Sequence, residues 1–259
     1  MDVSPSALTF HQHDSFRSQF LPDDHDITVY LPPGYQTARD RRYPVLYLHD
    51  GQNLFDPEKS FIKGQHWRVG EVATGLIQAG MLQPIIIVGV SNAGIRRLDE
   101  YTPTNDKRRG GGEADAYGRL LVEELKPFID AAYRTLPDAL NTGLGGSSLG
   151  GLVTLYLGLK YHDVFSRLAV LSPSVWWDRR AILKEVRNAR PKPRLRIWLD
   201  IGTREGRHHV DNLRLLKTGL LKNGWVEGDD LHYEEVQGGT HSERSWADRL
   251  ERVLQFLFR

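Results

Sequence analysis

The chain has 259 residues, a formal net charge of +1 and no cysteine. This length is normal for one α/β domain, so we expect a single domain over residues 1–259, and the lack of cysteine excludes disulfides, thiolate catalysis and cysteine metal sites. The balanced charge, the absence of a signal-peptide pattern in residues 1–6 and the absence of a membrane-spanning apolar run predict a cytoplasmic protein with neither nucleic-acid nor membrane partners.

Apolar periodicity along the chain alternates between short strand-like runs and longer helix-like runs. The predicted strands are residues 26–31, 43–49, 84–90, 140–145, 167–172, 195–201 and 231–236. The predicted helices are residues 69–79, 114–133, 149–161, 179–187, 210–223 and 245–258. This alternation predicts an α/β fold with a mostly parallel central sheet and helices on both faces, in which sites form at the carboxyl ends of the strands.

The most informative motif is G-x-S-x-G at residues 146–150, which places Ser148 between a predicted strand and a predicted helix. A sharp strand-to-helix turn of this kind lifts a nucleophilic serine above the sheet. The alternatives are an ordinary glycine-rich turn or a phosphate-binding loop. Since no lysine follows the glycines, a Walker-type loop does not fit.

A nucleophilic serine needs a histidine base and an acid that orients the base. His241 follows the last predicted strand behind two glycines, which is the expected chain order for a base after Ser148. Glu205 lies in the loop after the strand at residues 195–201 and is favoured as the acid, with Asp200 on that strand as the alternative. The pair His208 and His209 lacks a second cluster with ligand spacing, so we expect no metal.

The reaction also needs two backbone donors for the oxyanion. We expect these to be the N–H of Leu149, directly after the nucleophile, and the N–H of Gln52 in the loop at residues 50–55. An ordinary Asp-Gly turn is the alternative for that loop.

Aromatic and basic residues supply the candidates for substrate binding. Trp67, Trp176 and Trp177 would stack on a sugar or aryl group, with core packing as an equal alternative. Arg97 would meet an anionic substrate. The basic clusters at residues 107–109 and 179–180 are interpreted as solvated surface.

Taken together, these segments resemble the putative esterase family of α/β-hydrolases, which includes enterochelin-type siderophore esterases and feruloyl and acetyl xylan esterases. The matching segments are residues 43–55, 99–103, 145–151, 202–205 and 239–241. The resemblance implies the α/β-hydrolase fold, with Ser148 as nucleophile, His241 as base and Glu205 as acid. It gives no support to a metal or an organic cofactor.

We therefore expect a serine carboxylesterase that cleaves small, siderophore-type or sugar-type esters through an acyl-enzyme. Two alternatives stay open, namely an acyltransferase with the same triad and a non-catalytic binding protein with the α/β-hydrolase fold. The sequence specifies neither the acyl and alcohol groups nor the oligomeric state.

Overall fold

The computed structural model describes residues 8–259, so residues 1–6, where no signal peptide is expected, lie outside the described part. The described residues contain an eight-stranded sheet with the strand order β1-β2-β4-β3-β5-β6-β7-β8. The strands are β1 (Thr9–Phe16), β2 (His25–Leu31), β3 (Val45–His49), β4 (Ile86–Val90), β5 (Thr142–Ser147), β6 (Arg167–Leu171), β7 (Arg196–Gly202) and β8 (Leu231–Val236).

The strands from β4 to β8 are parallel to one another, whereas β2 pairs antiparallel with both β4 and β1. The expected mostly parallel sheet is confirmed. Strand β1 was not predicted, because its residues are half-buried or exposed and show no apolar alternation.

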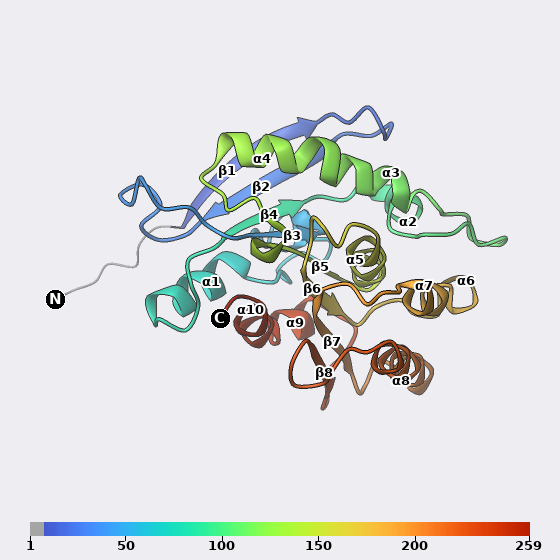
Figure 1. Ribbon diagram of the computed structural model, residues 1–259. Coiled ribbons are helices and arrows are strands. Elements are labelled where there is room, and N and C mark those ends of the chain that lie inside the picture. Colours follow the sequence, from blue (N-terminus) through green and yellow to red (C-terminus); the bar gives the residue numbers. More distant parts are fainter. Residues whose placement is uncertain (1–7) are drawn as a thin grey trace.

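Helices cover both faces of the sheet, as expected. They are α1 (Val69–Gln78), α2 (Arg97–Glu100), α3 (Ala114–Arg119), α4 (Lys126–Ala132), α5 (Leu149–Lys160), α6 (Trp177–Arg180), α7 (Ile182–Asn188), α8 (Arg207–Lys222), α9 (Glu243–Ala247) and α10 (Leu250–Phe258). A π-helical segment, Leu120–Leu125, joins α3 to α4. Figure 1 shows α1 and α10 on one face of the sheet and α3, α4, α5, α7 and α8 on the other.

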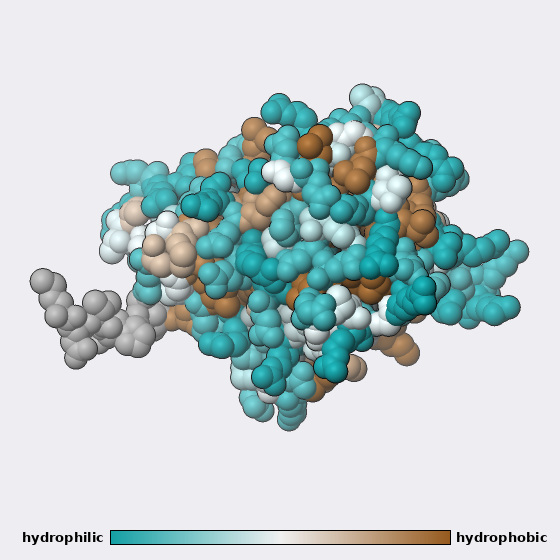
Figure 2. Space-filling model, turned by 90° about the horizontal axis from the view of Figure 1, so that it is seen from below, coloured by the Kyte–Doolittle hydropathy of each residue, from teal (hydrophilic) through white to brown (hydrophobic). Residues whose placement is uncertain are grey.

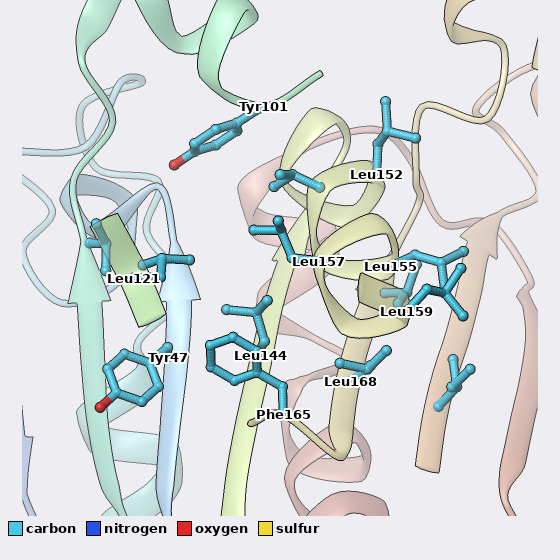
Figure 3. Packing of buried hydrophobic residues seen from close by; sticks show 14 of the residues in the cluster. Tyr47, Tyr101, Leu121, Leu144, Leu152, Leu155, Leu157, Leu159, Phe165 and Leu168 are labelled. Carbon is cyan, nitrogen blue, oxygen red and sulfur yellow. The ribbon is translucent and has the colours of Figure 1, made fainter. Parts of the chain in front are cut away.

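Each face of the sheet has its own hydrophobic core. Side chains of a strand point alternately to the two faces, so Val45 and Tyr47 of β3 belong to one core and Leu46 and Leu48 to the other. All are buried, because helices cover both faces. Figure 3 shows the larger core, in which residues of β5 and β6 meet the leucines of α5.

Two predicted helices are each divided in the structure. The helix expected at residues 179–187 is divided into α6 and α7, and only α7 is regular, because Asp178, Arg179 and Arg180 within α6 have left-handed backbone angles, with φ of 37°, 55° and 68°. A right-handed helix cannot continue through such residues. The helix expected at residues 245–258 is likewise divided into α9 and α10.

The outer surface is mainly polar. Figure 2 shows one face, seen from below, on which hydrophilic residues predominate and apolar residues form small separate patches. From residue 8 to the C-terminus, no helix has the length and apolar character needed to cross a bilayer.

Candidate active site

Ser148 occupies a sharp turn between β5 and α5. Its φ of 59° and ψ of −119° are unfavourable for a residue with a side chain. The neighbouring glycines make the turn possible. A Cβ atom on Gly146 would lie 3.0 Å from His49 Cδ2, and one on Gly151 would lie 2.8 Å from Leu171 O. The expected strand, turn and helix are therefore present around the serine.

Three side chains from distant parts of the sequence form one hydrogen-bonded line at the carboxyl ends of the strands. His241 Nε2 lies 3.0 Å from Ser148 Oγ, and His241 Nδ1 lies 2.7 Å from Glu205 Oε2. When Nδ1–H donates to the carboxylate, the lone pair on Nε2 faces the hydroxyl. This arrangement suits removal of the serine proton by the histidine.

Glu205 is held by several donors besides His241. Its Oε1 accepts hydrogen bonds from Ser172 Oγ at 2.6 Å and from Gly202 N–H at 2.7 Å. Burial tends to raise the pKa of Glu205, but the hydrogen bonds from His241, Ser172 and Gly202 outweigh it and hold the pKa below its ordinary value. Glu205 therefore remains ionised and fixed in orientation.

Asp200, the alternative acid, has a different set of partners. Its side chain is fully buried and accepts hydrogen bonds from Arg249 Nη1 at 2.6 Å and from Trp198 Nε1 at 2.7 Å. Burial raises its pKa despite these partners. Arg249 also lies 3.4 Å from Glu205 Oε1, so it links the two carboxylates. The geometry places Glu205 rather than Asp200 against His241.

Arg249 was not among the predicted site residues. An arginine in an amphipathic C-terminal helix region normally lies on the surface, but this side chain is completely buried. The pattern gives no signal for it, because the two carboxylates that it pairs with come from β7 and the following loop, about 45 residues earlier in the chain.

The loop after β3 is anchored by an ion pair. Arg97 Nε and Nη2 donate to the two carboxylate oxygens of Asp50, at 2.6 and 2.8 Å. Asn92 Nδ2 donates to the same carboxylate at 2.6 Å. Arg97 lines the cavity next to Ser148, but its guanidinium already has a carboxylate partner. In this structure it anchors the loop, rather than standing free for an anion as the sequence analysis expected.

The two expected oxyanion donors flank the serine. Gln52 lines the same cavity as Ser148, in the 3-10 turn Gly51–Asn53, and Leu149 is the first residue of α5. Within residues 8–259, neither N–H donates to another protein group. Free N–H groups at a helix start favour negative charge.

The cavity beside Ser148 has a volume of about 420 Å³. Phe61 and Ile62 line it together with Trp246, and Phe61 is 83% exposed. Phe61 and Ile62 were not predicted as site residues, because two apolar residues within a loop are common on ordinary protein surfaces.

The three tryptophans proposed for substrate binding have different environments. Trp67 and Trp177 are 3% and 1% exposed and belong to the two hydrophobic cores, which matches the core-packing alternative. Trp176 is half-buried and has the Arg109 guanidinium 5.2 Å from its ring centroid. In the described part of the chain, no group of three or more histidine, aspartate or glutamate side chains is placed to hold a metal.

We expect Gly51→Ala to reduce both activity and stability. The new Cβ would lie 2.7–2.8 Å from Ser91 N and from the carbonyl carbons of Gly89 and Val90, which are backbone atoms that cannot rotate away. The loop that carries Gln52 must shift, and losing one oxyanion donor lowers kcat by about 10²-fold. Steady-state kinetics of ester hydrolysis and thermal unfolding measure the two effects.

Gly75→Ala is the matched control. Gly75 lies within α1, and its added Cβ has no neighbour within 4 Å. We expect unchanged kcat and a stability gain of about 0.5–1 kcal/mol, because alanine is the better helix former. Equal kcat losses in the two variants would contradict the role assigned to the loop.

Comparisons with known proteins place the chain in an esterase family. A family model described as putative esterase matches residues 18–257. The chain is 28% identical over 255 residues to an endo-1,4-beta-xylanase/feruloyl esterase of Xylanibacter ruminicola, covering 96% of this chain and 31% of that protein. It is 31% identical over 159 residues to the ferri-bacillibactin esterase BesA of Bacillus subtilis, covering 55% and 52%. These alignments thus span about a third and about half of the two relatives.

Among solved structures, the BES protein from Bacillus cereus superposes with a TM-score of 0.76 at 24% sequence identity. The match covers 100% of this chain and 97% of that one. The shared feature is the fold, which confirms the expected α/β-hydrolase architecture.

Proposed function

The chain belongs to the putative esterase family and is a serine esterase, and on that premise we propose that Ser148, His241 and Glu205 are its catalytic triad. The observation that supports this assignment is the continuous line of hydrogen bonds from Ser148 Oγ through both nitrogens of His241 to Glu205. The chain order Ser, Glu, His is the order of α/β-hydrolases.

The proposed reaction proceeds through an acyl-enzyme. Ser148 Oγ attacks the ester carbonyl carbon while His241 Nε2 takes the hydroxyl proton. The N–H groups of Leu149 and Gln52 donate to the oxyanion, and His241 then protonates the departing alcohol. Water, deprotonated by the same histidine, releases the acid and restores Ser148. Glu205 keeps the imidazole oriented and stabilises its positive charge.

We infer that the substrates are small, siderophore-type or sugar-type esters. The relatives named above include a feruloyl esterase and a ferri-bacillibactin esterase, which supports this inference. The cavity beside Ser148, with the exposed ring of Phe61 at its edge, suits an apolar or aromatic group.

We expect Phe61→Ala to raise KM for p-nitrophenyl butyrate about fivefold and to leave kcat nearly unchanged. The substitution removes apolar ring surface that the substrate would cover, and this loss weakens the free energy of substrate binding by about 1 kcal/mol. Because Phe61 is 83% exposed, unfolding should be unaffected. Val226→Ala, at a 54% exposed position away from the cavity, is the control and should match wild type. An unchanged KM in Phe61→Ala would remove Phe61 from the substrate site.

Product analysis of p-nitrophenyl acetate and butyrate turnover tests the proposed reaction. A hydrolase releases one free acid for each p-nitrophenol. With added alcohol as acceptor, free acid should remain the main product. Predominant transfer to the alcohol would instead establish an acyltransferase with the same triad. No turnover of any ester, with the protein folded, would favour a non-catalytic binding protein.

A further inference from the structure

A second cavity, of about 890 Å³, is lined mainly by basic side chains. The chain brings together two clusters, residues 107–109 and 179–180, which are about 70 residues apart in the sequence. The cationic side chains in the lining are Lys107, Arg108, Arg109, Arg179 and Arg180. Two carboxylates, Asp106 and Asp178, oppose these five charges, and His208, His209 and Trp176 complete the lining.

Most of this positive charge is not neutralised by the protein. Within residues 8–259, Lys107, Arg108 and Arg179 form no ion pair, while Arg109 lies 3.6 Å from Asp106. The Arg180 guanidinium donates to the neutral Asn212 side chain at 2.7 Å. Gathering like charges costs free energy, so stability of the fold does not explain their convergence.

The backbone around the cavity is both fixed and strained. Asp178, Arg179 and Arg180 are three consecutive non-glycine residues with positive φ, a conformation that is unfavourable for each of them. Trp177, directly before Asp178, contacts the other basic segment: its Nε1 donates to Thr104 O at 3.1 Å, and Gly111 packs so tightly that a Cβ there would lie 2.8 Å from the Trp177 ring. These contacts hold the two basic segments against each other.

The cavity lies next to the proposed catalytic residues. Ser174 N–H donates to Ser148 O at 3.0 Å, and Trp176 is two residues further along the chain, at most about 7 Å away between Cα atoms. On the other side, the pKa of His209 is lowered, mainly by partial burial and next by its proximity to His241. Ser148 and His241 line the cavity that contains Phe61, and the basic cavity lies close to them through Trp176 and His209.

We propose that the basic pocket binds an anionic part of the ester substrate, a group with negatively charged oxygens that the free arginine and lysine side chains recognise. Guanidinium groups pair with such oxygens in a fixed geometry, and Trp176 offers a ring face beside them. The proposal rests on the esterase function proposed above. It refines the substrate class to esters with an anionic group on one side of the scissile bond.

Calorimetric titration of the full chain with benzene-1,3,5-tricarboxylate tests the pocket independently of catalysis. We expect wild type to bind and the double variant Arg108→Gln/Arg179→Gln to bind at least about tenfold more weakly. The double variant Arg39→Gln/Lys222→Gln removes the same charge at exposed positions outside the pocket, and it should bind like wild type. Circular dichroism and thermal unfolding verify that both variants fold.

The same three proteins are then compared in kcat/KM for mono-(4-nitrophenyl) glutarate and for 4-nitrophenyl butyrate. The pocket variant should lose at least about threefold in the ratio of the anionic to the neutral ester, and the control should keep the wild-type ratio. Equal tricarboxylate affinity in all three proteins would overturn the proposal, even with normal butyrate hydrolysis, in which case the esterase function stands. Tricarboxylate binding without hydrolysis of either ester would overturn the esterase function and, with it, the assignment of the anion to an ester substrate.

Discussion

We expect Ser148→Ala to lower kcat for p-nitrophenyl butyrate by about 10⁵-fold or more, because no acyl-enzyme can form without the hydroxyl. The oxyanion donors and the cavity remain, so a small residual rate above the uncatalysed reaction is compatible with this assignment. The hydroxyl lies 3.0 Å from His241 and 3.4 Å from Ser174 Oγ, and its removal leaves no buried charge unpaired. The variant should therefore stay folded, as circular dichroism and thermal unfolding can verify.

Ser147→Ala is the matched control, one residue away in the same motif. Ser147 is the last residue of β5 and is 5% exposed, and no hydrogen bond within residues 8–259 links its hydroxyl to His241. We expect it to retain much of the wild-type kcat. If Ser147→Ala were inactive and Ser148→Ala active, the nucleophile would be Ser147.

The second large effect is expected for Glu205→Gln, which should lower kcat/KM by about 10³- to 10⁴-fold. An amide cannot stabilise the imidazolium that forms when His241 takes the serine proton, and it no longer selects the productive tautomer. The amide still offers an acceptor oxygen to Ser172 and Gly202, so the loop should keep its shape. Steady-state kinetics and thermal unfolding separate the loss of catalysis from any loss of folding.

Asp200→Asn is the contrasting variant, because Asp200 is the other acid that the sequence allowed. It removes the carboxylate that lies 2.6 Å from the completely buried Arg249. We expect the free energy of unfolding to fall by about 3 kcal/mol, since a buried charge loses its main partner. The molecules that remain folded should have a kcat within about tenfold of wild type. A large kcat loss in Asp200→Asn with normal kcat in Glu205→Gln would reverse the assignment.

The sequence was sufficient for the parallel part of the fold, because strand-helix alternation is a local pattern. The sheet from β4 to β8 and the helices on both faces follow from it. The chain order of Ser148, Glu205 and His241 likewise allowed the site to be predicted, since loops at the carboxyl ends of parallel strands converge.

The features that local patterns could not reveal depend on contacts between distant segments. β1 is recognisable only through its pairing with β2, and the left-handed residues that distort α6 occur in a sequence with no glycine or proline. The same holds for the Arg97–Asp50 ion pair and for the burial of Arg249, since each needs a partner from another part of the chain.

Active-site labelling with a fluorophosphonate, followed by peptide mass spectrometry, tests the central claim most directly. The proposed triad predicts one adduct per chain on Ser148, loss of ester hydrolysis in proportion to labelling, and no adduct on Ser148→Ala. Glu205→Gln should be labelled far more slowly than wild type, because the same activated hydroxyl reacts with the probe. An adduct on another residue, or hydrolysis that persists after complete labelling of Ser148, would contradict the assignment of Ser148 as the nucleophile.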